Sequence, residues 1–154
     1  MSSKSFKIAV ASDHAGFELK QGVVQFLKDN GLSVEDLGPQ GTESVDYPDY
    51  ASLVASSVSK NKVDRGILIC GTGVGMCITA NKFSGVRAAA VSDLFTTEMT
   101  RKHNDTNVLC LGARVTKPDL ARDIIKTFLN TDFEGQRHEK RVKKIREIEK
   151  RNMK

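Results

Sequence analysis

A single cysteine stands where an apolar run meets a glycine-rich loop. Residues 66–76 have the sequence GILICGTGVGM, in which Cys70 separates the two parts. A glycine loop that opens a helix can line an anion pocket with its backbone amides, and such amides favour the thiolate form of a nearby thiol. Cys70 is therefore either a nucleophile or base, or a small buried residue that ends a strand. Its position alone does not decide between them.

The glycine spacing excludes two common phosphate-binding motifs. The loop is GxGxG, whereas a dinucleotide fingerprint needs GxGxxG and a P-loop needs GxxxxGK followed by Ser or Thr. The glycines either cradle a smaller anion or only permit a tight turn between strand and helix.

Histidines and arginines supply the other candidate groups. His14 follows Asp13, and His103 precedes Asn104; we expect both histidines on loops near the carboxyl ends of strands. Arg137 and Arg141 lie one helical turn apart, which suits a phosphate, although a solvated helix face is the usual meaning of this spacing. For a lone histidine such as His138, a helix cap or a surface position is the ordinary interpretation.

The elements that must position these groups follow from hydrophobic periodicity. Apolar β-branched runs alternate with helical patterns, which predicts βαβ units and a parallel sheet. We expect strands at residues 7–12, 33–36, 65–70, 87–91 and 108–111. We expect helices at residues 16–30, 49–60, 74–83, 94–102 and 118–129, and from 134 to the end. The last helix has a narrow apolar stripe, so we expect it at the domain edge or on a second subunit.

Ligands of open parallel sheets bind beyond the carboxyl ends of the strands. The first predicted strand ends at Asp13, the third at Cys70 and the fifth before Arg114. Reactive and charged side chains are thus expected at one edge of the sheet.

Composition limits the class of protein. A chain of 154 residues with 39% hydrophobic content suits one domain, here residues 1–154. The three cysteines, Cys70, Cys77 and Cys110, show no CxxC spacing, which disfavours a disulfide framework and a zinc site; we interpret the latter two as buried fillers. No apolar run has the length of a signal-peptide core or a membrane span, so we expect a soluble cytoplasmic protein.

Positive charge is concentrated in the last predicted helix. Residues 135–154 hold nine Lys or Arg and three Asp or Glu, a net of +6, whereas residues 1–134 hold 15 and 16, a net of −1. Such a segment could contact nucleic acid, an acidic membrane or a phosphorylated small molecule, and composition does not choose among them.

Together, several short motifs resemble a known enzyme family over about residues 7–145. They are ASDHAG at 11–16, DYP at 46–48, GILICGTGVGM, ANK at 80–82, GVRAA at 85–89, HN at 103–104, NVL at 107–109, and GQRH at 135–138 with Arg141. This set closely resembles the type B ribose-5-phosphate isomerases, whose family also includes galactose-6-phosphate and allose-6-phosphate isomerases. One departure is Gln136, where the family often has glycine; we expect it to disturb a turn rather than the chemistry.

The resemblance implies a Rossmann-like α/β/α sandwich with a five-stranded parallel sheet and a basic C-terminal helix. It implies a homodimer or a dimer of dimers whose active sites combine both subunits. It also implies interconversion of ribose 5-phosphate and ribulose 5-phosphate, a pentose phosphate pathway step, without metal or cofactor and without nucleic acid or membrane partners. An isomerase of allose or galactose 6-phosphate is the alternative within the family.

The same resemblance assigns roles to residues. Cys70 matches the base that moves a proton between C1 and C2, and His103 matches the group that helps to open the furanose ring. Tyr47 matches a residue that lines the site, and Thr72 is expected to donate to the thiolate. The remaining matches are to sugar, phosphate and anion contacts: Asp13, His14, Gly71, Thr72, Gly73, Val74, Gly75, Asn104, Arg114, Arg137 and Arg141.

General chemistry agrees with these roles. Aldose–ketose conversion removes a weakly acidic proton beside a carbonyl, so it needs a base and donors aimed at the developing enediolate. A different class of function is also open: the loop could hold a phosphorylated ligand while the basic helix contacts nucleic acid. That alternative leaves Cys70, His103 and Asp13 without a role.

Overall fold

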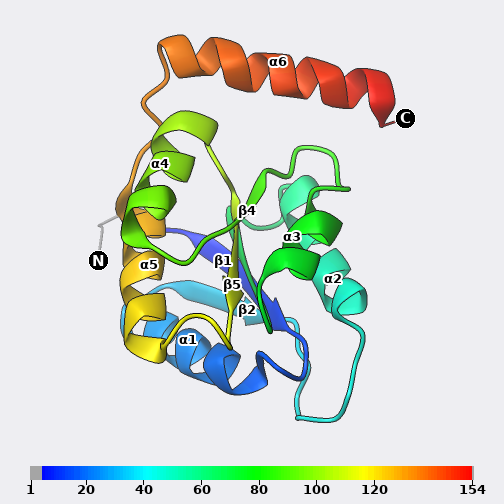
Figure 1. The fold of residues 1–154 in the computed structure, drawn as a ribbon, viewed down its shortest axis with the longest axis vertical. Coiled ribbons are helices and arrows are strands. Elements are labelled where there is room, and N and C mark those ends of the chain that lie inside the picture. The colour runs from blue at the N-terminus through cyan, green and yellow to red at the C-terminus, as the bar shows by residue number, and fades with distance from the viewer. Residues whose placement is uncertain (1–4, 154) are drawn as a thin grey trace.

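Parallel strands and the helices that connect them form three layers in the computed structural model, which describes residues 5–153 (Figure 1). The strands are β1 (Lys7–Ser12), β2 (Ser33–Asp36), β3 (Arg65–Cys70), β4 (Ala88–Ala90) and β5 (Val108–Gly112). The helices are α1 (Phe17–Asp29), α2 (Tyr47–Ser59), α3 (Val74–Ala80), α4 (Leu94–Asn104), α5 (Pro118–Asn130) and α6 (Arg137–Asn152). This arrangement confirms the Rossmann-like α/β fold.

The strand that ends at Cys70 lies in the middle of the sheet. The strand order is β2-β1-β3-β5-β4, and every pair is parallel. Gly66, at the start of β3, is level with Val108, whereas Cys70, at its end, is level with Gly112. The apolar residues of β3 are buried, as expected for a strand covered on both faces. Cys70 is therefore held rigidly at the carboxyl edge.

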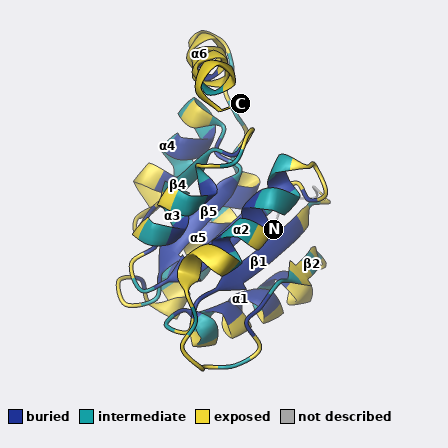
Figure 2. Cartoon of the chain, turned by 90° about the vertical axis from the view of Figure 1, so that its right-hand side faces the viewer, coloured by how far each residue is buried: buried dark blue, intermediate teal, exposed yellow. Residues whose placement is uncertain are grey.

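Helices cover both faces of the sheet and enclose two apolar cores. α1 and α5 cover one face, where Leu27, Ile124 and Phe128 are almost fully buried (Figure 1). α2 and α3 cover the other face, where Val54 and Met76 are inaccessible to solvent. Figure 2 shows the strands as the most buried layer between these helices.

The basic helix α6 lies across the edge of the sheet at which the strands begin (Figure 1). Val142 is buried, and the Glu149 carboxylate accepts a hydrogen bond of 2.9 Å from the Gly85 amide. Farther along the same stripe, Ile145 and Ile148 remain 46% and 51% exposed. The predicted position at the domain edge is thus confirmed, and part of the apolar stripe is left uncovered (Figure 2).

The predicted helices and strands all form, and their boundaries within the described residues differ from the predicted ones by three residues or fewer. α2 begins at Tyr47, two residues early, because Pro48 suits the first turn of a helix. α6 begins at Arg137 rather than at residue 134 because Gly135 and Gln136 have φ angles of +69° and +51°. A right-handed helix cannot continue through such residues. Gln136 therefore lies in a turn whose positive φ favours glycine. This agrees with the expectation that its departure from the family pattern affects a turn.

Among residues 5–153, no helix combines the length and the apolar character needed to cross a membrane.

A fully buried lysine links α1 to β2. Lys20 is 0% exposed, and its Nζ donates to both carboxylate oxygens of Asp36, at 2.8 and 2.9 Å, and to the Pro39 carbonyl at 3.0 Å. Asp36 also accepts a bond from the Gly38 amide. These contacts satisfy a charge that would otherwise be costly to bury.

Asp36→Ala is therefore expected to lower the free energy of unfolding by about 3 kcal/mol, because it leaves the Lys20 charge buried without its counter-ion. Urea denaturation measures this change. Glu35→Ala is the matched control, since Glu35 is an exposed carboxylate on the same strand. Equal losses in the two variants would contradict the assigned role of the ion pair.

Candidate active site

A pocket of about 420 Å³ opens at the carboxyl ends of β1, β3 and β5. Its walls come from the loops after these strands and from α2 and α3. The lining residues are Asp13, Tyr47, Cys70, Gly71, Thr72, Val74, Gly75, Ile78 and Arg114. All of them except Ile78 are among the residues singled out from the sequence, so one chain brings eight predicted site residues together.

The thiol of Cys70 is held by the loop that follows it. Cys70 is 5% exposed, and its Sγ accepts a hydrogen bond from the Gly73 amide at 3.1 Å. Gly73 has a φ of +85°, a conformation that glycine adopts without steric cost. This turn directs the amide back toward the sulfur. An N–H group aimed at sulfur is suited to a thiolate.

The expectation that Thr72 donates to the thiol is wrong for this structure. The Thr72 hydroxyl oxygen instead accepts a hydrogen bond of 3.3 Å from the Val74 amide. This contact stabilises the turn into α3, and the Gly73 amide takes the place beside Cys70.

Close packing against an aromatic ring explains the last glycine of the loop. A Cβ atom added to Gly75 would lie 2.5 Å from Cε1 of Tyr47. Tyr47 belongs to the first turn of α2 and is 41% exposed. The absence of a side chain at Gly75 therefore lets this ring form one wall of the pocket.

Groups of opposite charge flank Cys70. Asp13 is buried, and its Oδ1 accepts a hydrogen bond from the Gly16 amide at 3.0 Å, which fixes the loop after β1. The Arg114 guanidinium lies over the loop, since a Cβ atom added to Gly71 would be 3.2 Å from its Nη1. The Arg114 amide also donates to the Gly71 carbonyl at 3.1 Å. The pocket can therefore bind an anion beside a carboxylate that accepts hydrogen bonds.

His14 lies next to this pocket but does not line it. Its side chain is exposed, and its Nδ1 accepts a hydrogen bond of 3.1 Å from the Val45 amide. The expected position near the carboxyl edge is confirmed for His14.

The expected position of His103 is wrong within a single chain. α4 begins beyond the end of β4 and carries the chain back to the start of β5, so His103 and Asn104 lie at the amino edge of the sheet (Figure 1). Arg137 and Arg141, on α6, belong to the same end of the molecule. Strand β3 is six residues long, which separates the two edges by roughly 20 Å.

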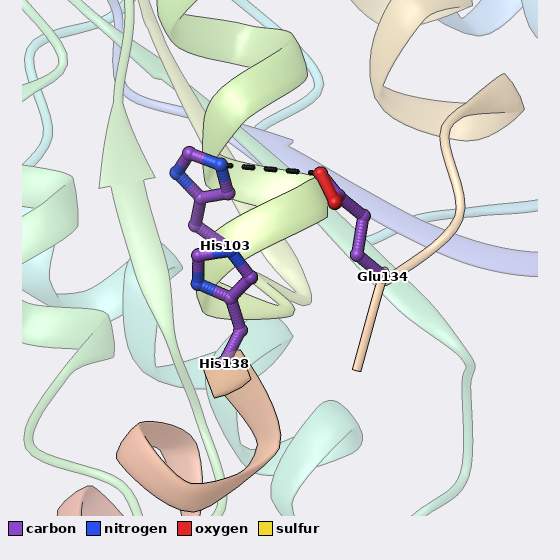
Figure 3. A group of neighbouring side chains, drawn as sticks. All are labelled: His103, Glu134 and His138. Carbon is purple, nitrogen blue, oxygen red and sulfur yellow. Dashed lines mark ion pairs between the residues drawn. The ribbon is translucent and has the colours of Figure 1, made fainter. Parts of the chain in front are cut away.

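Part of the arrangement around His103 was not predicted from the sequence. The His138 ring stacks on the His103 ring with centroids 4.1 Å apart, and Glu134 Oε1 lies 4.0 Å from His103 Nε2 (Figure 3). His138 is 6% exposed, so its interpretation as a surface or cap residue is wrong. The only signal of this cluster in the sequence is that Glu134 and His138 lie close together along the chain.

Comparisons with known proteins agree with the fold. The ribose/galactose isomerase family model matches residues 8–145. The ribose-5-phosphate isomerase B of Escherichia coli is 49% identical over 145 residues, which cover 94% of this chain and 97% of that protein. The structure of the Clostridium thermocellum ribose-5-phosphate isomerase B matches with a TM-score of 0.93 at 51% identity, over 94% of this chain and 98% of that one. The Mycoplasma genitalium ribose-5-phosphate isomerase B with bound ribulose-5-phosphate matches with a TM-score of 0.90 at 46% identity, over 94% and 96% of the two chains.

The other two cysteines form a pair behind the pocket. Cys110 is fully buried, as expected, whereas Cys77 is only half-buried, because the outer side of α3 faces solvent. A hydrogen bond with the Cys110 thiol, aided by the Ala90 backbone, lowers the pKa of Cys77 to about 7. The same bond and burial raise the pKa of Cys110. Of these two thiols, Cys77 is therefore the one that ionises near neutral pH.

Alkylation of Cys77 by iodoacetamide is expected to rise with pH and to reach half its maximal rate near pH 7, because the thiolate is the reacting form. Peptide mass mapping distinguishes Cys77 from Cys70 and Cys110. Cys110→Ala serves as the control, since it removes the thiol whose hydrogen bond lowers the Cys77 pKa. A midpoint near the ordinary value of 9.0 in the unaltered protein would contradict the pairing.

Proposed function

This chain belongs to the ribose/galactose isomerase family, and we propose that Cys70 is the base with which it interconverts ribose 5-phosphate and ribulose 5-phosphate. The activity is that of a ribose-5-phosphate isomerase, an aldose–ketose isomerase. The position of Cys70 carries the mechanistic proposal, because its sulfur meets the Gly73 amide of the loop at the carboxyl end of the central strand.

The proposed reaction moves one proton between neighbouring carbons. With the sugar in its open-chain aldehyde form, the Cys70 thiolate removes the proton from C2, and the electron pair forms an enediolate across C1 and C2. The thiol then returns a proton to C1, while the proton of the O2 hydroxyl is transferred to O1, so that C1 carries a hydroxyl group and C2 becomes the carbonyl carbon. No electrons are lost or gained, so the steps need only positioned proton carriers.

Backbone amides and charged side chains stabilise the intermediate. Negative charge develops on O1 and O2, and the amides of residues 71–75 are the donors nearest to Cys70 that can meet it. Asp13 accepts hydrogen bonds from sugar hydroxyl groups, and Arg114 supplies positive charge over the same loop. Tyr47 closes one side and limits access of water to the enediolate.

Cys70→Ala is expected to lower kcat for ribose 5-phosphate by about 1,000-fold, because general-base catalysis of this kind is worth roughly 100- to 10,000-fold. The assay follows conversion in deuterated water by NMR, with deuterium appearing at C1 of ribulose 5-phosphate in the unaltered enzyme.

Cys77→Ala is the matched control, since Cys77 is a neighbouring thiol that does not line the pocket. It should retain near-normal turnover. A Cys70→Ala protein that folds normally and turns over at the wild-type rate would refute Cys70 as the base.

A second copy of this chain completes the proposed site. The pocket of one chain contains Cys70, whereas the histidine proposed for ring opening lies at the opposite edge of the same chain. Exposed apolar side chains occur at both places: Val74 and Ile78 beside the pocket, and Ile145 and Ile148 on α6. A dimer that joins these surfaces would bury them and bring His103 to the neighbour's Cys70.

In the proposed dimer, the basic end of α6 gains a role in binding the substrate. Arg137 and Arg141 are exposed one turn apart at the start of the helix. In the proposed dimer they reach the neighbouring pocket and hold the substrate phosphate together with Arg114. Guanidinium groups bind phosphate through paired hydrogen bonds, so this contact orients the reacting carbons without touching them.

Mixed dimers test the shared site. Cys70→Ala and His103→Asn are each expected to be nearly inactive on ribose 5-phosphate. When the two are unfolded together and refolded, about half of the dimers are hybrids, and each hybrid has one intact site. Activity should therefore return to roughly a quarter of the wild-type value. Mixing without recovery, although hybrids form by native mass spectrometry, would place Cys70 and His103 in the same chain's site.

A further inference from the structure

Three side chains from separate segments converge at the end of α4. His103 belongs to the last turn of α4, Glu134 to the segment before α6, and His138 to the first turn of α6 (Figure 3). A ligand atom from each lies within 4.8 Å of those of the other two. Figure 3 shows His103 Nε2 facing Glu134, while the other ring nitrogen points away from it.

The backbone fixes Glu134 in this place. The Glu134 amide donates to the Lys102 carbonyl at 3.1 Å, directly beside His103. The buried Arg101 side chain donates to the Thr131 carbonyl at 3.1 Å and to the Thr106 carbonyl at 2.6 Å. The bond to Thr131 joins the end of α4 to the segment that carries Glu134. Its closeness to His103 is therefore built into the fold and does not depend on a flexible side chain alone.

The arrangement does not suit a metal ion. The two imidazole rings are stacked at an interplanar angle of 13°. The lone pair of a ring nitrogen lies in the plane of the ring, and two nearly parallel planes cannot both point at one ion about 2 Å from each nitrogen. In addition, His138 Nε2 accepts a hydrogen bond of 3.4 Å from the Arg137 guanidinium, a cation.

We infer that Glu134 is a positioning residue, which acts through His103 to promote opening of the substrate's furanose ring. This inference rests on the proposed function, in which His103 contacts the sugar. The carboxylate 4.0 Å from His103 Nε2 favours a proton on that nitrogen, while the other ring nitrogen faces away from Glu134 and is open to the substrate. It also stabilises the imidazolium that forms when a proton is accepted.

The step balances as a proton relay. The free nitrogen of His103 takes the proton of the anomeric O1 hydroxyl, the bond between C1 and the ring oxygen breaks, and a C1 carbonyl forms. The imidazolium then gives a proton to the ring oxygen, which becomes the C4 hydroxyl. Glu134 remains ionised throughout and exchanges no proton with the substrate.

The stacked histidine holds the ring plane. His138 lies face to face with His103, which restricts rotation of the His103 ring. Burial and the neighbouring His103 lower the pKa of His138.

Ribulose 5-phosphate allows ring opening to be separated from proton transfer. Its C5 oxygen carries the phosphate, so it has no hydroxyl that can close a furanose ring on C2, and it enters the site as an open chain. Exchange of its C1 proton with solvent needs Cys70 but no ring opening. Isomerisation of ribose 5-phosphate needs both.

Glu134→Gln is expected to lower kcat/KM for ribose 5-phosphate about tenfold, a fraction of the 100- to 10,000-fold range of general acid–base catalysis. The rate at which ribulose 5-phosphate exchanges its C1 proton in deuterated water should stay within twofold of the wild-type rate. NMR follows both reactions. Glu139→Gln is the matched control, since Glu139 is an exposed carboxylate on α6, 3.9 Å from Arg146; neither reaction should change.

Three results would overturn the inference. Equal losses in both reactions would show a merely structural role, and no loss in either would show that Glu134 is dispensable. Inactivation by EDTA with recovery on adding Zn²⁺ would show that the cluster binds a metal. A failure of the proposed function gives a different result. In that case the Cys70→Ala variant would still exchange the C1 proton of ribulose 5-phosphate with solvent, whatever the Glu134→Gln variant does.

Discussion

All strands of this sheet run in the same direction, and that constraint determines where its reactive groups can lie. Each helix between two strands must carry the chain from the carboxyl edge back to the amino edge. Groups at strand ends, such as Cys70 and Arg114, therefore collect at one edge, whereas groups at helix ends, such as His103, collect at the other. A site that needs both sets requires contact between opposite edges, which a second copy can provide.

The interior supports this separation of groups between the two edges by holding the strand ends rigidly. β3 is paired on both sides, and its apolar residues are buried between two layers of helices, so Cys70 has little freedom to move. Charged residues tie the periphery to this centre. Lys20 joins α1 to β2 through Asp36, and Arg101 joins the end of α4 to the segment after α5. The buried charges thus lie where helices must be fixed relative to the sheet, at both edges.

The sequence predicted the order, the type and nearly the full extent of the elements, because apolar periodicity reflects burial directly. It also predicted eight of the nine residues around the Cys70 pocket. The convergence of strand ends in a parallel sheet indicated Asp13, Cys70 and Arg114, and the resemblance to the isomerase family supplied the others. The sequence-based prediction placed His103 at the wrong edge, although the residue lies between a predicted helix and the strand that follows it, a position that a parallel sheet places at its amino edge. The burial of His138 and the contact with Glu134 depend on how α6 folds back over α4, a tertiary contact with no local signal.

Division of the chemistry between the two edges matches a difference between the two steps. Proton transfer at carbon creates an enediolate, which fixed amides stabilise, and the loop after β3 carries such amides beside Cys70, the proposed base. Ring opening moves protons between oxygens and needs a group that can accept and release a proton near neutral pH, which is the property of imidazole. Helix ends near the surface suit the second group, since a charge that forms in contact with solvent costs less than a buried one. The opposite requirements of a buried thiol and a half-exposed imidazole therefore favour their placement on different elements, with the dimer proposed above bringing them to one substrate.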